Sequence, residues 1–407
     1  MHGIEFIDGG VTAPKGFKAS GLHVGFRQNP QRRDASLVFS EQEQTVAAGT
    51  FTRNVFCAAP VKLSRSVAAG GHARAVILNS GNANAATGKP GDAAAAKQQE
   101  LCAQALGISA HEVFVASTGV IGVQLPLEPF ESGLPQLAAA LSSSRQAAHD
   151  AACGIMTTDT VPKECAITFE TDGKTYTIGG MSKGSGMIQP NMATMLAVIT
   201  TDAALEASTL QKALKAAVDV SFNKITVDSD TSTNDSCFCL ANGAAGGPVI
   251  QEDSSAYDAF AAALTQLCEN LARQMAADGE GASKLVTVNV TGAANDDDAD
   301  KAARTIANSP LVKTAIAGRD CNWGRIAAAL GRSGAAFKQE DVDIDIMGMP
   351  VLRGGLPTGF DEDEALRRFE APEIVIDVEL GAGTSSTRMW TCDLTHDYIS
   401  INADYRS

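Results

Sequence analysis

The spacing of apolar residues along the chain changes repeatedly between the period of a helix and the period of a strand. From Ser255 to Ala277 the apolar positions recur every three or four residues, which predicts the clearest helix in the sequence. Over residues 285–290 they alternate with polar positions, as in a strand with one buried face. Helical and strand segments follow each other in both halves of the chain, so we expect a mixed α/β or α+β class.

The same patterns predict further elements along the chain. We expect helices at 92–106, 134–152 and 203–222, a hairpin at 166–178, and strands at 35–40, 75–79, 112–116, 195–200, 342–347, 373–380 and 398–402. The acidic run 295–298 is expected to open a helix, because acidic residues suit a helix N-terminus.

One junction interrupts this regular pattern. A glycine-rich turn leads to Pro190, and an apolar, β-prone run starts at Thr194. Gly184 and Gly186 permit backbone angles that other residues avoid, and Pro190 fixes its own φ. The peptide between Ala193 and Thr194 is therefore expected where an irregular loop is forced into a strand.

Two interpretations of this junction stay open at the level of composition. If the Ala193–Thr194 bond breaks, Thr194 gains a free α-amine beside its nucleophilic hydroxyl, a pairing that activates threonine nucleophiles. The plainer interpretation is a loop that leads into a buried strand, and composition alone favours it.

Composition and charge narrow the class of protein. A chain of 407 residues, 44% hydrophobic and 19% charged, is typical of a soluble globular protein with two or three domain-sized units. The net charge of −15 disfavours nucleic acids and anionic membranes as partners. Residues 1–193 carry 15 basic and 15 acidic side chains, whereas residues 194–407 carry 17 and 32. The charge therefore changes at the Ala193–Thr194 junction, which supports two segments of different character.

The sequence predicts a cytoplasmic protein without a metal. It shows no apolar run of about 18 residues, no secretory signal and nine cysteines without a CxxC pair, which indicates reduced thiols. The oxygen-rich stretch 227–236 lacks the glycine and terminal glutamate of a helix-loop-helix calcium site. Cys237 and Cys239 are expected on one face of a strand, which is poor metal geometry.

Several loops carry residues suited to chemistry. Thr118 and Gly119 follow a predicted strand, where free backbone amides can form an oxyanion hole. Residues 80–88 are small and polar, which suits either a close backbone approach or a tight structural turn. Glu280 is expected on a loop behind a helix, and residues 317–325 form a second glycine-punctuated loop with Arg and Trp side chains.

Longer motifs resemble one known family. The motifs that carry the resemblance lie at 183–188 with 190–196, 79–84, 117–122, 318–325 and 401–405. They follow one order over nearly the whole chain. On these motifs the chain resembles the ornithine acetyltransferase (glutamate N-acetyltransferase) family, whose members are self-cleaving bifunctional proteins of arginine biosynthesis. The resemblance implies layered sheets flanked by helices in an N-terminal-nucleophile-like fold.

The resemblance also implies an activity and its residues. The precursor is expected to cut itself between Ala193 and Thr194 into an α chain, 1–193, and a β chain, 194–407. Thr194 would then carry acetyl from N2-acetylornithine to glutamate in a ping-pong reaction in the cytoplasm. The implied oxyanion hole is Thr118 and Gly119, and the implied substrate contacts are Thr157, Lys183, Thr194, Glu280, Asn402 and Ser407.

Some features depart from the family or stay open. Ser407 stands where members often end in Thr, and Ala86 where Cys is common. No cofactor or metal is implied, and acetyl-CoA is an open second donor. The expected assembly has two α and two β chains. The alternatives are an N-terminal-nucleophile amidohydrolase or aminopeptidase that uses water as acceptor, and an uncleaved binding or scaffold protein.

Overall fold

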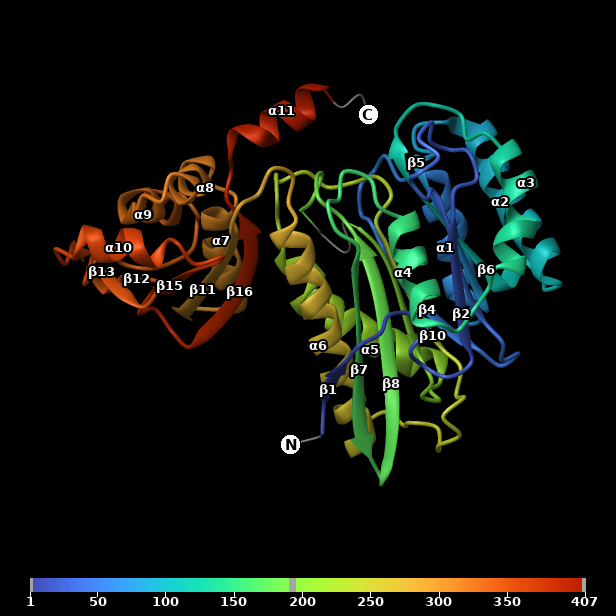
Figure 1. Cartoon of the computed structure of the whole chain (residues 1–407). Helices are drawn as coiled ribbons and strands as arrows, with labels where there is room; N and C mark the ends of the chain where they lie inside the picture. The colour runs from blue at the N-terminus through green and yellow to red at the C-terminus, as the bar shows by residue number, and fades with distance from the viewer. Residues whose placement is uncertain (1–2, 190–194, 405–407) are drawn as a thin grey trace.

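Two stacked sheets form the larger part of the molecule (Figure 1). The structure is a computed structural model that describes residues 3–189 and 195–404. One sheet has the strand order β1-β7-β8-β9-β10-β4 and the other the order β2-β3-β5-β6. The first consists of β1 (Glu5–Ile7), β7 (Lys163–Thr171), β8 (Lys174–Lys183), β9 (Leu196–Thr201), β10 (Ser236–Ala241) and β4 (Val46–Phe51). The second consists of β2 (Phe17–Leu22), β3 (Ala35–Ser40), β5 (Ala75–Asn82) and β6 (Val113–Val120).

Helices cover the outer faces of both sheets. Apolar side chains of α5 (Ala207–Val220) and α6 (Ser255–Ala277) pack on the six-stranded sheet, and those of α2 (Gly88–Leu106) and α3 (Glu128–Ala139) on the four-stranded sheet. The helices α1 (Ala59–Gly70) and α4 (Arg145–Gly154) touch both sheets. Between the sheets lies a shared core in which the rings of Phe114 and Phe238 are 4.6 Å apart. The order is therefore helix, sheet, sheet, helix, which confirms layered sheets flanked by helices.

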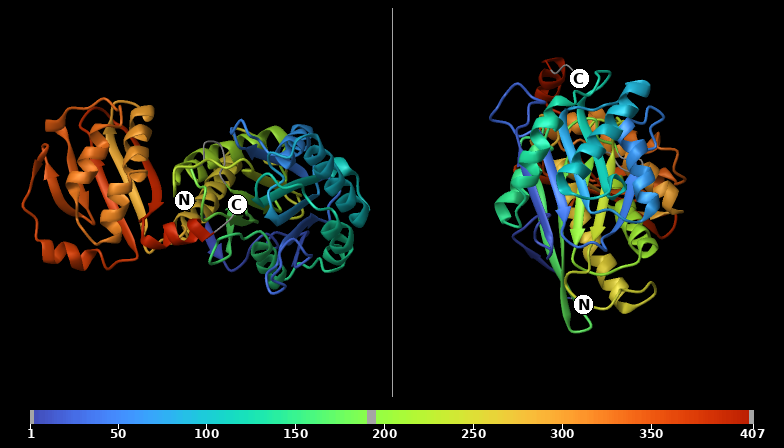
Figure 2. Two further views of the ribbon diagram at one scale, coloured as in Figure 1. Left: turned by 90° about the horizontal axis from the view of Figure 1, so that it is seen from above. Right: turned by 90° about the vertical axis from the view of Figure 1, so that its right-hand side faces the viewer.

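A third sheet forms a separate lobe beside the stacked sheets (Figures 1 and 2). Its order is β14-β13-β12-β15-β11-β16, and it has its own apolar core. Its strands are β11 (Leu285–Ala293), β12 (Asp343–Ile346), β13 (Met349–Arg353), β14 (Leu356–Pro357), β15 (Glu373–Glu379) and β16 (Ser385–Cys392). Its helices are α7 (Asp296–Ala307), α8 (Pro310–Ala317), α9 (Trp323–Gly331) and α10 (Glu362–Arg368).

The last helix returns from this lobe towards the stacked sheets. After β16, α11 (His396–Asp404) extends from the third-sheet lobe towards the stacked sheets, at the top of the view in Figure 1. Three short 3-10 helices complete the fold: Ala110–Glu112, Phe222–Lys224 and Gln339–Asp341.

The predicted α and β chains share one sheet. In the six-stranded sheet, β8 pairs with β9 and β4 pairs with β10, so the two strands from 194–407 lie between strands from 1–193. The lobes instead divide near residue 285, where the third sheet begins. As a cleavage boundary, the division at Ala193–Thr194 stays a prediction.

Two sequence-based element predictions are wrong. The helix expected at 134–152 is two helices, α3 and α4, because Ser144 caps a new helix by accepting a hydrogen bond from the Ala147 amide. The strand expected at 398–402 is part of α11, a helix in which no residue is buried. The helix predicted from Ser255 to Ala277 is confirmed with the same bounds.

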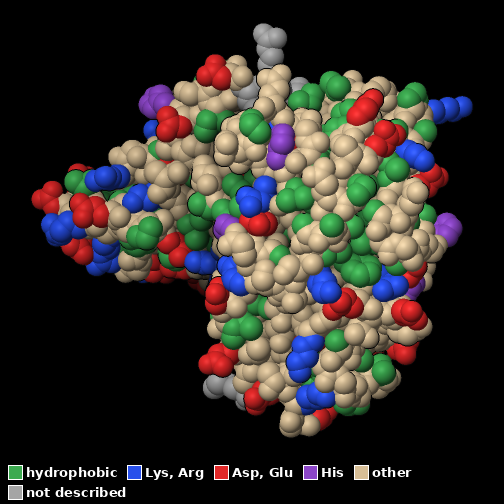
Figure 3. Space-filling model, turned by 45° about the vertical axis from the view of Figure 1, so that its right-hand side comes forward, with side chains coloured by type: hydrophobic (Ala, Val, Ile, Leu, Met, Phe, Trp, Pro, Cys, Tyr) green, Lys and Arg blue, Asp and Glu red, His purple; other side chains and the backbone are tan. Residues whose placement is uncertain are grey.

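Charges of both signs are interspersed over the face shown in Figure 3. The net charge of −15 is therefore not gathered into a single acidic patch on that face. Within residues 3–189 and 195–404, no helix is long and apolar enough to cross a membrane.

Candidate functional site

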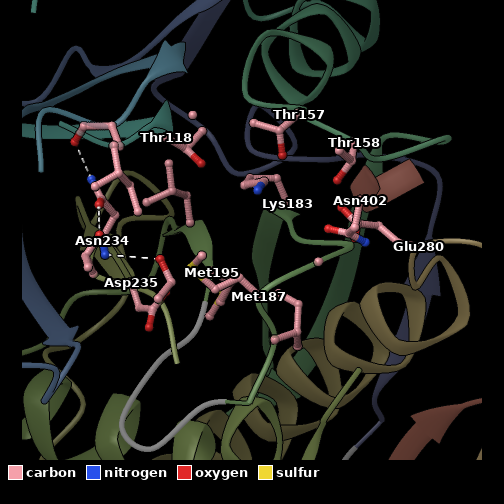
Figure 4. A pocket seen from close by; sticks show the side chains of 18 residues that line it. Thr118, Thr157, Thr158, Lys183, Met187, Met195, Asn234, Asp235, Glu280 and Asn402 are labelled. Carbon is pink, nitrogen blue, oxygen red and sulfur yellow. Dashed lines mark hydrogen bonds between the residues drawn. The ribbon is translucent and has the colours of Figure 1, made fainter. Parts of the chain in front are cut away.

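A cavity of about 180 Å³ opens where the two lobes meet the ends of β6, β8 and β10 (Figure 4). Segments far apart in the sequence form its wall: the end of β6, the loop after α4, the end of β8, the residues before β10, the end of α6, and α11. Six residues singled out from the sequence line it: Thr118, Gly119, Thr157, Lys183, Glu280 and Asn402.

Three further predicted site residues lie outside the described residues. They are Ala193, Thr194 and Ser407. The neighbours of Thr194 on its C-terminal side, Met195 and Leu196, line the cavity. The structure thus brings the described candidates together, and the catalytic and binding roles given to them stay predictions.

Gly119 has a position that only glycine can occupy. The strands β5 and β6 run parallel, and their register shifts beside Gly81 and Asn82. Gly119 has a φ of +131°, and a Cβ there would lie 2.4 Å from the Gly81 carbonyl carbon. The backbone amides at this strand end therefore depend on the close approach of β5 and β6.

Buried amide side chains hold this strand end. Asn234 donates from Nδ2 to the carbonyl oxygens of Ala83, at 2.6 Å, and Ser117, at 2.8 Å. The Ser117 hydroxyl in turn donates to Asn79 Oδ1 at 2.7 Å. Because buried polar groups that are fully bonded are rigid, this network fixes the backbone on which Thr118 lies.

Lys183 places a buried cation in the cavity. It is the last residue of β8 and only 7% exposed. Burial lowers the pKa of its ammonium, as does the charge of Lys163, whereas the carboxylates of Asp159, Asp235 and Glu280 act to raise this pKa. Within the described residues, the Lys183 ammonium has no hydrogen bond or ion pair. It is therefore available to a carboxylate of a ligand.

Glu280 lies opposite, against a residue without a side chain. Its carboxylate would be 2.4 Å from a Cβ at Gly186, and Asn402 Nδ2 donates to Glu280 Oε2 at 2.7 Å. The Glu280 amide donates to the Ser185 carbonyl at 3.0 Å. The cavity thus presents a buried lysine on one wall and a glutamate on another (Figure 4).

Strand pairing in the third sheet explains how Glu280 and Asn402 meet. The strands β11 and β16 are antiparallel, with Leu285 opposite Cys392, so the segment before β11 and the segment after β16 leave the sheet together. Asp393 fastens these segments by accepting hydrogen bonds from the amides of Ser283, at 2.7 Å, and Lys284, at 3.0 Å.

Comparison with known proteins identifies the family. A family model described as the ArgJ family matches residues 18–407. The chain belongs to the ArgJ family. The arginine biosynthesis bifunctional protein ArgJ of Symbiobacterium thermophilum is 49% identical over 404 residues, which is 99% of this chain and 100% of that protein. The protein of the same name from Chlorobaculum tepidum is 48% identical over 399 residues, 98% of this chain and 97% of that protein.

A solved structure is also similar to this ArgJ-family chain. It is the ornithine acetyltransferase of Mycobacterium tuberculosis in complex with ornithine, 41% identical, with a TM-score of 0.45, covering 47% of this chain and 100% of the solved one. The family resemblance predicted from the sequence motifs is confirmed by the match of the ArgJ family model and the two relatives.

Sequence reasoning about this ArgJ-family chain missed Asp235. It lines the cavity at 2% exposure, and within residues 3–189 and 195–404 its Oδ2 atom has no hydrogen-bond partner. Burial raises the pKa of its carboxyl well above the usual range, against the charge of Lys183, which lowers it. The signal in the sequence is the oxygen-rich stretch 227–236, which suggests a calcium site less than a wall of polar side chains. The described residues contain no group of three or more His, Cys, Asp or Glu side chains that could hold a metal ion.

The same stretch holds both flanks of the segment 190–194. Asp228 accepts hydrogen bonds from the amides of Met187, at 2.6 Å, and Ile188, at 2.8 Å. On the other side, the Ser236 amide donates to the Met195 carbonyl at 2.8 Å. The residues next to the predicted cleavage site are thus anchored to the chain that leads into β10.

The second glycine-punctuated loop of the ArgJ-family chain lies elsewhere. Residues 318–322 connect α8 and α9 in the third-sheet lobe, whereas 323–325 begin α9, so the loop expected at 317–325 is shorter than predicted. None of the residues 317–325 lines the cavity. Their Arg and Trp side chains therefore do not form a wall of the site in this structure.

Proposed function

We propose that this ArgJ-family protein transfers the acetyl group of N2-acetylornithine to glutamate, giving ornithine and N-acetylglutamate for arginine biosynthesis. The observation that carries the proposal is the cavity itself. Lys183, which has no ion-pair partner among the described residues, lies on one wall, and the Glu280–Asn402 pair lies on another. Membership of the ArgJ family supports the same reaction.

The two charged walls suit the groups of the two amino acids. Both substrates carry an α-carboxylate, which Lys183 pairs with in our proposal. The side-chain ammonium of acetylornithine faces Glu280, whose carboxylate Asn402 orients. Thr157, which also lines the cavity, completes the contacts to the substrate together with Ser407.

The acetyl group moves in two steps. The Thr194 hydroxyl attacks the acetyl carbonyl while its own α-amine accepts the proton, since an α-amine has an ordinary pKa of about 7.7–8.0. Donors at Thr118 and Gly119 stabilise the oxyanion, a contribution of about 3–4 kcal/mol in other enzymes. Ornithine leaves as the amide bond breaks, and the amine of glutamate then takes the acetyl group from acetyl-Thr194. This order predicts ping-pong kinetics.

Maturation supplies the nucleophile. In this proposal the Thr194 hydroxyl attacks the Ala193 carbonyl, and the peptide bond between the two residues breaks as the Thr194 amine takes up a proton. Water then hydrolyses the resulting ester, which gives the chains 1–193 and 194–407 and restores the Thr194 hydroxyl. These assemble as two α and two β chains in the cytoplasm and require no cofactor or metal. Acetyl-CoA remains a candidate second donor of acetyl to glutamate.

A donor assay tests the reaction. The protein is incubated with N2-acetylornithine with and without glutamate, and in parallel with acetyl-CoA and glutamate. We expect N-acetylglutamate and ornithine to form when both N2-acetylornithine and glutamate are present, and varying these two substrates should give ping-pong kinetic patterns. Rapid release of free acetate without acetylglutamate would replace the transferase by an amidohydrolase.

Intact mass tests maturation. The full chain has a mass of 42.1 kDa, and we expect two species that correspond to 1–193 and 194–407. Thr194→Ala should remain a single chain without acetyl transfer. A wild-type protein that transfers acetyl as an uncut chain would overturn the role of the freed amine.

A further inference from the structure

A buried charge cluster lies behind the cavity wall. Lys163, at the start of β7, is 0% exposed. Its ammonium donates to Asp159 Oδ1 at 2.7 Å and to Asp278 Oδ2 at 2.5 Å. Both carboxylates are nearly inaccessible, with side-chain exposures of 0% and 8%. Neither Lys163 nor its two carboxylate partners line the cavity, so this cluster would not contact a ligand bound there.

Asp159 connects this cluster to two residues of the cavity wall. Its Oδ1 accepts a hydrogen bond from the Gly184 amide at 2.8 Å, and its Oδ2 accepts one from the Thr157 amide at 2.9 Å. Gly184 is the next residue after Lys183. Burial acts to raise the pKa of the Asp159 carboxyl, but the charges of Lys183 and Lys163 outweigh it and hold this pKa below its usual range. Asp159 is thus an anion that attracts two buried lysines.

Only one of the two lysines forms the ion pair. Lys163 lies within hydrogen-bond distance of Asp159, whereas no carboxylate of residues 3–189 and 195–404 lies within salt-bridge distance of the Lys183 ammonium. Asp278 anchors Lys163 from its other side, and also accepts a hydrogen bond from the Thr160 amide at 3.0 Å. The pairing of Asp159 is therefore fixed by a cation that faces away from the cavity.

We propose that Lys163 is a positioning residue that keeps Lys183 available to the α-carboxylate of the substrate by holding Asp159 in its own ion pair. This inference rests on the proposed function, which assigns that carboxylate to Lys183. An internal Lys183–Asp159 pair would compete with the substrate, because a buried cation gains most from the nearest anion in a medium of low dielectric. Lys163 removes that competitor.

The test removes Lys163 without changing the buried net charge. Lysine removal alone leaves two buried carboxylates without their partner and endangers folding. The double variant Lys163→Met/Asp278→Asn removes one charge of each sign and leaves Asp159 facing Lys183. The matched control is Asp278→Asn. The asparagine oxygen still accepts from Lys163 and the Thr160 amide. The Thr160 hydroxyl, which donates to Asp278 Oδ1 in the wild type, accepts from the asparagine amide instead.

Two ligands separate loss of the carboxylate contact from general damage. Binding of ornithine and of 1,4-diaminobutane, which is ornithine without its carboxylate, is measured by calorimetry on the mature wild-type, control and double-variant proteins. In the double variant we expect the Kd of ornithine to rise about tenfold or more, which is the scale of one hydrogen bond to a charged group. The Kd of 1,4-diaminobutane should stay within about twofold in all three proteins.

The outcomes distinguish this inference from the proposed function. If the wild-type protein transfers acetyl and the double variant binds ornithine as tightly as wild type, the role of Lys163 is wrong. The same holds if both ligands weaken equally, or if Asp278→Asn alone weakens ornithine as much as the double variant. If the wild-type protein neither transfers acetyl nor binds ornithine, the proposed function itself fails.

Discussion

At the scale of single residues, the missing side chain of Gly186 decides where Glu280 can lie. A Cβ at residue 186 would be 2.4 Å from all three heavy atoms of the Glu280 carboxylate. We expect Gly186→Ala to displace this carboxylate and raise the KM for acetylornithine about tenfold, because hydrogen bonds to charged groups contribute about 1.5–3 kcal/mol. Steady-state kinetics measures the effect. Gly331→Ala, where a Cβ meets nothing within 4 Å, is the matched control. An unchanged KM in Gly186→Ala would contradict the placement of Glu280.

Asp235 makes stability depend on pH. Burial raises the pKa of its carboxyl well above the usual range, so the folded protein holds this proton more tightly than the unfolded chain does. The protonated Asp235 carboxyl therefore makes its full contribution to the free energy of unfolding below about pH 3.9, the ordinary pKa of an aspartate in an unfolded chain. This contribution is lost as the pH rises through the higher pKa of the folded state. Asp235→Asn, which carries no such charge, should gain stability over wild type as the pH rises.

Urea unfolding at pH 5 and pH 8 measures this difference. We expect Asp235→Asn to have the higher free energy of unfolding at pH 8, by about 1–3 kcal/mol, the usual cost of a buried polar group without a partner. The difference in free energy of unfolding between the two proteins should be smaller at pH 5. Asp230→Asn, at an exposed position of the same stretch, should show no such trend. An equal difference at both pH values would rule out that ionisation of Asp235 lowers the free energy of unfolding.

At the scale of elements, the paired ends of β11 and β16 deliver Glu280 and Asn402 to the cavity. Asp393, 1% exposed, accepts from the Ser283 amide and hydroxyl and from the Lys284 amide. Asp393→Ala should leave these donors unpaired, lower the free energy of unfolding by about 1–3 kcal/mol and raise the KM for acetylornithine more than it lowers kcat. Urea titration and kinetics check both. A lower free energy of unfolding with an unchanged KM would show that this junction contributes to stability alone.

The elements that the sequence predicts well are those with a strong apolar face. The stripe from Ser255 to Ala277 predicted α6 with its observed bounds, and Ser254 caps it by accepting a hydrogen bond from the Tyr257 amide. In contrast, α11 buries none of its residues, so no helical period was imposed on 398–402 and the short alternation was misinterpreted as a strand.

The residues of the candidate site also differ in how well the sequence predicts them. Motifs located six of its lining residues, because glycines and polar residues at strand ends stand out in the sequence. Lys163 and Asp278 gave no such signal, since a buried charge has the same letter as a solvated one. Asp235 lies in the oxygen-rich stretch 227–236, but nothing in that stretch distinguishes it from the other oxygen-bearing residues there. Lys163 and Asp278 meet over 115 positions of sequence, which only the fold brings together.

At the scale of the whole molecule, the two predicted chains depend on each other. The six-stranded sheet places β8 beside β9 and β4 beside β10, so either chain alone would expose unpaired strand edges and part of the core that the two stacked sheets share. We expect 1–193, produced alone, to lack a cooperative thermal transition, and co-expression with 194–407 to restore it together with acetyl transfer. Calorimetry of 1–193 and of the co-expressed protein measures this. A cooperative transition in 1–193 alone would contradict the prediction.

The pairing of strands from the two segments in one sheet has a consequence for the molecularity of refolding. Before a cut at Ala193–Thr194, the edges of β8 and β9 find each other within one molecule, and the refolding rate does not depend on protein concentration. After the cut, the same strands belong to two molecules, and their encounter becomes second order. When it is diluted out of denaturant, a protein matured in this way would refold far less efficiently than its own precursor. Maturation would therefore make unfolding close to irreversible.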